Sequence, residues 1–257
     1  MRVGDIIAAI EQFAPLSIQE GWDNSGLSIG SPEDEVHGVL VGFDCTAELI
    51  DEAVAAGCDM VVTHHPLIFK GLKRIQGGDS VSDAVIRAVR AGVAVYAAHT
   101  TADKVIAGVS GAMARRLELQ DITLMEDEGG FGLGAVGTLP RPMTGEEAIA
   151  YVKDKFGLST VRVSRPVDRV ERVAMCGGSG ASEIEAARAS GAQLYISGDI
   201  SYHHFFTPDG FMVMDIGHFE SEVDIVGILF KVISEKFPTF AVRISDNLGR
   251  SNPVRYY

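Results

Sequence analysis

Residues 36–65 read VHGVLVGFDCTAELIDEAVAAGCDMVVTHH, and this stretch decides the fold class. Apolar runs rich in β-branched residues lie near its two ends, at about residues 36–43 and 59–64, as is typical of buried strands. Between them, at about residues 46–57, the pattern is that of a helix. The alternation of strand, helix and strand predicts a parallel α/β sheet.

A second stretch repeats this pattern at a constant shift of 134 positions, without a gap. Residues 170–199 read VERVAMCGGSGASEIEAARASGAQLYISGD. Any two units of strand, helix and strand share such a pattern by chance, but a gapless match through all three favours an internal repeat. The matching pairs are Val36 and Val170, Val39 and Val173, Ile50 and Ile184, Ala53 and Ala187, Gly57 and Gly191, and Thr63 and Ser197. His64 and His65 then fall on Gly198 and Asp199.

Further strands and helices surround both copies of the repeat. An acidic, glycine-rich joint, MEDEGGFG (125–132), separates two series of elements. The sequence therefore predicts an α/β fold of two similar lobes, residues 1–125 and 126–257, or one domain in which they interlock. Beyond the repeat, we expect strands near 93–98, 193–197 and 211–216 and helices near 1–17, 79–91, 103–117, 144–156 and 218–236.

Composition narrows the classes of protein that the chain can belong to. The formal net charge of −13 and the absence of clustered Lys and Arg residues argue against a surface for duplex nucleic acid. No apolar stretch is long enough to span a bilayer, and the first residues resemble an amphipathic helix rather than a signal peptide. Three widely spaced cysteines without a CxxC pair fit a reducing cytoplasm.

Histidines follow several of the predicted strands. His64 and His65 end one strand and His99 ends another, while Asp199 and His218 follow strands of the second series. Ligands of open α/β sheets collect beyond the carboxyl ends of the strands, so these side chains are candidates for one binding site. Because consecutive strand residues point to opposite faces, His64 and His65 would diverge and each could bind a different ion.

The stretch GHFESE (217–222) adds a carboxylate to the candidate donors. On a helix that starts near His218, Glu222 lies four positions on and on the same face, whereas Glu220 points elsewhere. Asp103 is either a further ligand or a carboxylate at the start of its helix, where the helix dipole favours it. Imidazoles and carboxylates together suit zinc, iron, manganese or nickel, and such a set could hold two ions about 3.5–4 Å apart.

Other residues have supporting or alternative roles. The glycine-rich CGGSGASE (176–183) either brings backbone close to a neighbour or cradles an anion. Asp44 could hydrogen-bond a liganding imidazole, and His99 is either a proton-transfer group or a satisfied polar residue. Trp22 is expected to pack, with its neighbours Asp23 and Asn24 bordering the site.

Five motifs together resemble those of the Ngg-interacting-factor-three-like family, whose bacterial members are often labelled GTP cyclohydrolase I type II homologues. The resemblance covers essentially the whole chain. It implies two α/β lobes around a di-metal cleft and a homohexamer, a toroid built from trimers. The motifs are GWDNSGL (21–27), VVTHHPLIF (61–69), AAHTTAD (97–103), SGDISYHH (197–204) and GHFESE (217–222).

The same resemblance implies the roles of individual residues. His64 and Asp103 would hold one ion, His65 and His218 the other, and Glu222 would bridge them. His203, by its position in the family pattern, would be a catalytic proton carrier, and His99 is the other candidate because it ends a strand beside Asp103. The chain departs from the family pattern at Thr101, Ala102 and Ser201, where asparagine, leucine and lysine are usual; the loss of the lysine weakens the case for an anion contact there.

Two functions follow from these expectations. The first is a metal-dependent hydrolase, in which two divalent ions activate water and polarise the bond under attack, with a nucleotide-like or phosphoester substrate. The second is a metal-handling, metal-insertion or interaction protein without hydrolytic turnover. No guanine-reading motif points to GTP itself.

Overall fold

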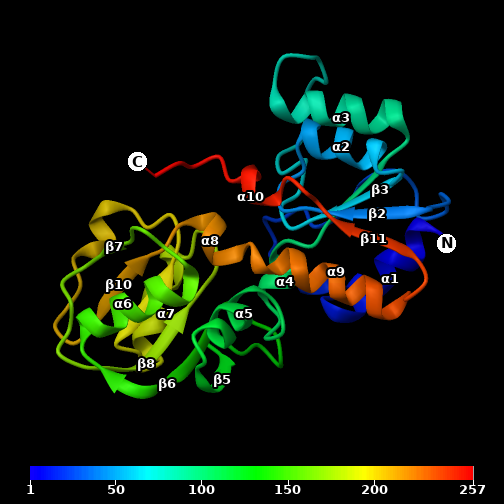
Figure 1. Cartoon of the computed structure of the whole chain (residues 1–257). Coiled ribbons are helices and arrows are strands. Elements are labelled where there is room, and N and C mark those ends of the chain that lie inside the picture. The colour runs from blue at the N-terminus through cyan, green and yellow to red at the C-terminus, as the bar shows by residue number, and fades with distance from the viewer. Residues whose placement is uncertain (257) are drawn as a thin grey trace. The chain divides into compact units, whose positions relative to one another are not determined.

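The computed structural model describes residues 1–256, which form two compact units, each with one mixed sheet flanked by helices (Figure 1). Unit 1 comprises Met1–Ala102 and Ile225–Arg255, and unit 2 comprises Asp103–Asp224 and Tyr256. The sequence predicted lobes of residues 1–125 and 126–257. The units instead group residues 103–125 with the second sheet and residues 225–255 with the first, because strands from these segments pair there.

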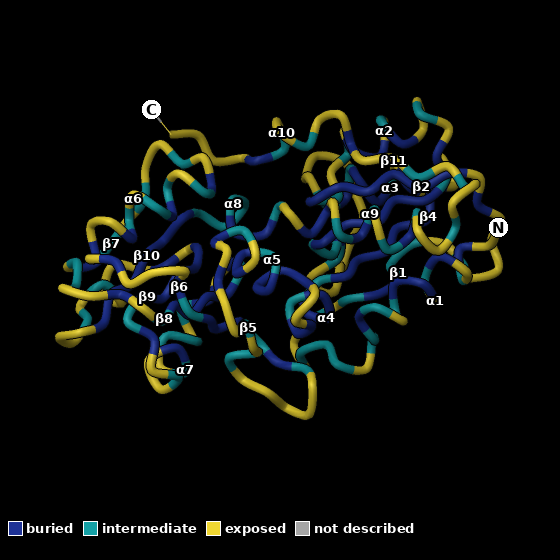
Figure 2. Tube along the Cα trace, turned by 60° about the horizontal axis from the view of Figure 1, so that its bottom comes forward, coloured by how far each residue is buried: buried dark blue, intermediate teal, exposed yellow. Residues whose placement is uncertain are grey.

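The sheet of unit 1 has five strands in the order β1-β4-β3-β2-β11. Only β1 is antiparallel to its neighbour, β4. The three central strands are buried throughout, as expected of parallel strands covered on both faces, and they confirm the predicted strands (Figure 2). Their bounds are β1 Gly26–Ile29, β2 Gly38–Val41, β3 Met60–Thr63, β4 Ala94–Ala97 and β11 Ala241–Ile244.

Helices cover both faces of this sheet. α2 (Ala47–Ala55) and α3 (Ser80–Ala91) pack on one face, where their apolar residues share a core with those of the central strands (Figure 1). α1 (Val3–Phe13) lies on the other face, and Tyr96 of β4 donates a hydrogen bond to Glu11 at 3.4 Å. Lys236 at the end of α9 (Asp224–Lys236) donates a hydrogen bond to Gln12 of α1 at 3.2 Å. η1 (Leu16–Ile18) and α10 (Leu248–Ser251) are short helical turns.

The sheet of unit 2 has six strands in the order β5-β6-β8-β9-β10-β7. The central β8, β9 and β10 are parallel, and the remaining pairs are antiparallel. The strands are β5 Gln120–Leu124, β6 Ala135–Met143, β7 Arg162–Val163, β8 Val170–Met175, β9 Leu194–Ser197 and β10 Met212–Asp215. α5 (Val109–Arg116) and α6 (Gly145–Phe156) share a core with one face, and α7 (Ile184–Ala189), which follows η2 (Ala181–Glu183), contributes to the core of the other.

The 134-residue shift seen in the sequence also relates the two structures. It carries β3 onto β9 residue for residue. Asp59, just before β3, accepts hydrogen bonds from the backbone amides of residues 37–38 at 2.8 and 3.1 Å. Gln193, 134 positions later, accepts them from the amides of residues 171–172 at 3.0 and 2.9 Å. The two units therefore repeat backbone details as well as an apolar pattern.

Two predicted helices are interrupted. The prediction of one helix over 103–117 is wrong: α4 (Thr100–Asp103) ends first, and α5 starts only after residues 104–108. This loop packs on α5 so closely that a side chain on Gly111 would meet the carbonyl oxygen of Ile106 at 1.7 Å. The predicted helix over 218–236 is divided at Val223 into α8 (His218–Glu222) and α9.

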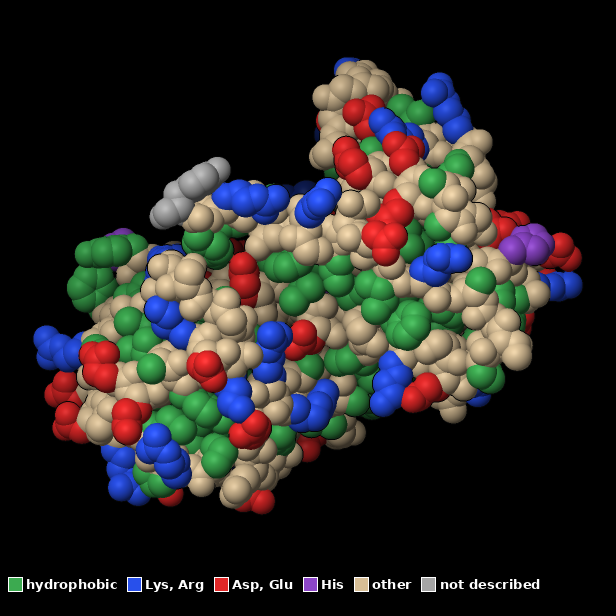
Figure 3. Space-filling view, in the orientation of Figure 1, with side chains coloured by type: hydrophobic (Ala, Val, Ile, Leu, Met, Phe, Trp, Pro, Cys, Tyr) green, Lys and Arg blue, Asp and Glu red, His purple; other side chains and the backbone are tan. Residues whose placement is uncertain are grey.

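Charged side chains of both signs are spread over the surface. On the face shown in Figure 3, basic and acidic side chains are interspersed and form no continuous basic surface. Within the described part of the chain, no helix combines the length and the apolar character needed to cross a membrane.

Candidate metal centre

Three histidines of unit 1 form a cluster at the carboxyl end of its sheet. His64 and His65 follow β3, and His99 follows the adjacent parallel strand β4. One ring nitrogen from each lies within 4.8 Å of the others, and the ring centroids are 4.9–5.4 Å apart. Adjacent parallel strands end at the same edge of the sheet, and this brings together residues that are 34 or 35 positions apart in sequence.

Each of these imidazoles is held through its Nδ1 atom. His65 donates to Asp44 at 2.7 Å, His99 donates to Asp23 at 2.7 Å, and His64 donates to the carbonyl of Ala98 at 2.9 Å. Carboxylate and carbonyl oxygens only accept, so the proton of each neutral ring lies on Nδ1 and the lone pair on Nε2. This arrangement is typical of metal-binding histidines, and it confirms the hydrogen bond predicted for Asp44.

Asp23 anchors the edge of the cluster and was not predicted to do so. Its side chain is fully buried and accepts hydrogen bonds from His99, from Ser25 at 2.7 Å and from the Thr100 hydroxyl at 2.5 Å. Burial by itself would raise the pKa of Asp23, but these hydrogen bonds outweigh it and hold the pKa well below its usual range. A permanently charged carboxylate therefore orients His99.

Unit 2 has a candidate group of its own, with two carboxylates and one imidazole. His218 and Glu222 lie on one face of α8, with Nε2 and Oε2 3.0 Å apart, as their four-residue spacing predicted. Glu220 lies elsewhere, beside Gly217. Asp103 is the last residue of the four-residue α4 and lies in its single turn, so both readings of this carboxylate stay predictions. One of its carboxylate oxygens lies within 4.8 Å of one from Glu222.

Asp199 orients His218 in the way that Asp44 orients His65. His218 Nδ1 donates to Asp199 at 2.8 Å, and the Ser179 hydroxyl donates to the same carboxylate oxygen at 2.8 Å. Burial opposes ionisation of Asp199, but these two hydrogen bonds prevail and lower its pKa. Asp199 has a left-handed backbone, with φ of 50°, which turns the chain sharply after β9.

The glycine-rich loop after β8 packs directly against α8. Gly178 has φ of 62°, and a β-carbon there would meet the Glu222 carboxylate at 2.2 Å. A β-carbon on Gly198 would meet backbone atoms of His218 at 2.7–2.8 Å. Of the two readings of CGGSGASE, these contacts support close backbone approach. The glycines leave the space that His218 and Glu222 occupy.

The remaining sequence-predicted residues lie outside these two groups. His203 is exposed in η3 (Tyr202–Phe205), its ring 5.4 Å from Tyr202 and 6.4 Å from Phe206, so its role in proton transfer stays a prediction. Thr101 is buried and Ser201 is exposed. The assignment of the donors of both units to the same two ions also stays a prediction.

Trp22 corrects another expectation. It was predicted to pack, but its side chain is 60% exposed. Its ring centroid lies 6.1 Å from that of His99 and 6.0 Å from that of Phe69, which is also exposed. The sequence pointed to this region only through the neighbouring residues Asp23 and Asn24, which were expected to border the site.

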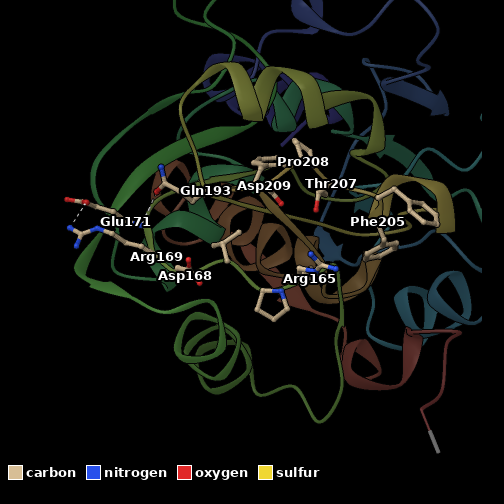
Figure 4. A pocket seen from close by; sticks show the side chains of 14 residues that line it. Arg165, Asp168, Arg169, Glu171, Gln193, Phe205, Thr207, Pro208 and Asp209 are labelled. Carbon is tan, nitrogen blue, oxygen red and sulfur yellow. Dashed lines mark hydrogen bonds and ion pairs between the residues drawn. The ribbon is translucent and has the colours of Figure 1, made fainter.

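A cavity of about 850 Å³ lies elsewhere in unit 2 (Figure 4). Arg165 and Phe205 line one side, and the ion pair between Arg169 and Glu171 lies toward the opposite rim. No candidate metal ligand lines this cavity.

A family model described as Duf34/NIF3 (NGG1p interacting factor 3) matches residues 1–249. The chain belongs to the Duf34/NIF3 family. This confirms the resemblance seen in the five motifs. The units described above are thus a Duf34/NIF3 fold.

Curated relatives and solved structures agree with this assignment. A Clostridium acetobutylicum protein named GTP cyclohydrolase 1 type 2 homolog is 32% identical over 238 residues, which cover 90% of this chain and 89% of the relative. A Lactococcus lactis protein of the same name is 32% identical and matches over 98% of both chains. The crystal structure of Staphylococcus aureus protein SA1388 matches 100% of this chain and 99% of its own, with a TM-score of 0.92 and 24% identity, and supports the Duf34/NIF3 fold alone.

Proposed function

We propose that the donors of the two units bind a pair of divalent ions and that the protein is a metal-dependent hydrolase of nucleotide-like or phosphoester substrates. In this proposal His64 and Asp103 hold one ion, His65 and His218 hold the other, and Glu222 bridges them. The mixed nitrogen and oxygen donor set fits zinc, iron, manganese or nickel. The name GTP cyclohydrolase 1 type 2 homolog, carried by the relatives, supports a nucleotide-like substrate.

The observation that carries the proposal is the anchoring of four imidazoles through Nδ1. His65, His99 and His218 each donate to a carboxylate, and His64 donates to a backbone carbonyl. Histidines that only stabilise a fold need not share one tautomer. Here all four rings carry the proton on Nδ1, which leaves the Nε2 lone pair for a ligand. Rigidly oriented ligands favour ions that stay bound, as in an enzyme, over ions that are transferred to another protein.

The residues of this chain would have distinct roles in hydrolysis. When bound, divalent ions supply Lewis acidity and lower the pKa of water toward neutrality. Asp44 and Asp199 keep His65 and His218 in the liganding tautomer. His99, whose Nδ1 proton is held by Asp23, would accept or donate a proton at Nε2.

Metal analysis combined with a variant on α8 tests the proposal. Protein purified without chelators or nickel affinity resin should contain about two divalent ions per chain. Glu222→Ala should lose metal and the turnover of a nucleotide and phosphoester panel, whereas Glu220→Ala, on the same short helix, should keep both.

Two outcomes would contradict the hydrolase. Full turnover by metal-free Glu222→Ala protein would exclude the ions from the reaction. Rapid transfer of bound iron or zinc to an acceptor apo-protein, with no turnover of any panel member, would identify a metal-handling protein instead.

A further inference from the structure

Two exposed aromatic rings flank the histidine cluster of unit 1. Trp22 is 60% exposed and Phe69 is 45% exposed. Their ring centroids are 6.0 Å apart, and each lies 6.1 Å from the centroid of His99. Adjacent exposed aromatic rings beside a group of candidate ligands are typical of a ligand-binding surface.

The two rings are carried by loops that are tied together. Asn24 donates a side-chain hydrogen bond to the carbonyl of Ile68 at 2.5 Å, which joins the Trp22 loop to the residue before Phe69. Asp23, between Trp22 and Asn24, is anchored by His99 and Thr100. The rings are thus held in place before any ligand arrives, which lowers the entropy cost of binding.

The loop that carries Phe69 is locally basic in an acidic protein. Residues 60–78 contain no Asp or Glu, while Lys70, Lys73 and Arg74 follow Phe69 directly. All three cations are exposed, and within residues 1–256 none of them forms an ion pair. Three cations are too few for a nucleic-acid duplex but suit the charge of a single phosphate group.

We infer that Trp22 and Phe69 form a platform for the planar heteroaromatic ring of a phosphate-bearing small molecule, with the cations of residues 70–74 attracting its phosphate. This inference rests on the proposed function, because it names the part of the substrate that is held beside the histidines. A ring stacked on either aromatic side chain lies next to His99. Its substituents are then within reach of the imidazole cluster.

The single tryptophan of the chain makes the test direct. Fluorescence of the metal-loaded protein, excited at the tryptophan band, is titrated with a nucleoside 5′-monophosphate and, in parallel, with ribose 5-phosphate. Stacking of the base should quench Trp22, whereas ribose 5-phosphate should leave its emission unchanged.

Variants then separate the platform from the rest of the protein. By equilibrium dialysis, Trp22→Ala and Phe69→Ala should each bind the nucleotide about tenfold more weakly, as expected for a lost stacking contact. Phe206→Ala, which removes an aromatic side chain that is 73% exposed in unit 2, is the matched control and should bind normally. Circular dichroism confirms that each variant is folded.

The outcomes distinguish this inference from the proposed function. Equal binding of nucleotide and ribose 5-phosphate, or unchanged binding by both platform variants, would overturn the platform. Turnover that does not depend on Trp22 or Phe69 would support the hydrolase but not the platform.

Nucleotide binding that needs Trp22, in protein that binds no metal and hydrolyses nothing, would support the platform and exclude the hydrolase. Concentration-dependent protection of Trp22 from acrylamide, without nucleotide binding, would show that a second copy covers the rings and overturn the inference.

Discussion

In unit 1, β3 ends on His64 and His65, whereas in unit 2 the equivalent strand β9 ends on Gly198 and Asp199. The sequences of the two strands align without a gap, and both strands are fully buried. One unit therefore presents imidazoles at this strand end, and the other presents a carboxylate that orients an imidazole from α8. Packing thus constrains which residues the repeat can have within the sheet. At the strand ends, the two units carry different functional side chains.

The helices of the repeat differ in a related way. In unit 1, Thr46 caps α2 by accepting from the Leu49 amide at 3.2 Å. The position 134 residues later is Gly180, whose carbonyl accepts from the Tyr195 hydroxyl at 2.7 Å. A β-carbon on Gly180 would meet that hydroxyl at 2.6 Å. Unit 2 has no side-chain cap at this position, and the Glu183 amide, equivalent to that of Leu49, donates to the Gly180 carbonyl at 3.1 Å instead.

The largest expected effect comes from copying the strand end of unit 1 into unit 2. Gly198→His should destabilise the protein by about 3 kcal/mol, because a β-carbon there overlaps the backbone of His218. Urea unfolding measures the change. Gly227→Ala, an exposed helix position with open space around it, is the control and should stabilise by about 0.5–1 kcal/mol. Wild-type stability of Gly198→His would show that the two strand ends are interchangeable.

The orienting carboxylates should matter equally in both units. Asp44→Asn and Asp199→Asn should each weaken metal binding by about 10- to 100-fold, because the amide no longer fixes the histidine tautomer. Competition with a chromophoric chelator gives the affinity. Asp168→Asn, at an exposed position lining the separate cavity of unit 2, should have no effect. A loss confined to one unit would mean that the other histidine is not a ligand.

The helix cap should be needed in unit 1 only. Thr46→Ala should cost about 1 kcal/mol, because the Leu49 amide loses its acceptor. Urea unfolding of Thr46→Ala is compared with that of Thr160→Ala, an exposed loop threonine. If both variants match the wild type, the cap does not distinguish the two units.

The smallest expected effect concerns pH and the pair Asp59 and Gln193. Burial would raise the pKa of Asp59, but hydrogen bonds from the His37 side chain and from amides 37–38 lower it overall. The stabilisation is therefore present above the unfolded pKa of about 3.9 and is lost as the pH falls through the lower folded value. Asp59→Asn places an amide at this position, as at Gln193. It should reduce the loss of stability at acidic pH by about 0.5 kcal/mol, and the effect is small because the site is partly exposed. Identical curves for both proteins would show that this carboxylate contributes nothing.

The central strands and most helices could be predicted because their signals are local. Apolar runs of β2, β3, β8 and β9 need burial on both faces, and the helices between them follow a helical period. The short edge strands β1 and β11 were missed, since only partners distant in the chain make them strands. The break between α4 and α5 was also missed, because the close packing of Gly111 against Ile106 in the loop before α5 leaves no mark on the periodicity.

The sequence by itself determined the class of fold, the repeat, the family and the residue types able to bind a metal, because these depend on local patterns and side-chain chemistry. The pairing of His218 with Glu222 followed from helix geometry alone. Only the tertiary structure decided that Asp23, 76 positions away, orients His99, and that Trp22 stands exposed beside it. Such contacts depend on which strand ends and loops become neighbours in the folded chain. Neither a long-range hydrogen bond nor the exposure of a ring produces a periodic pattern in the sequence.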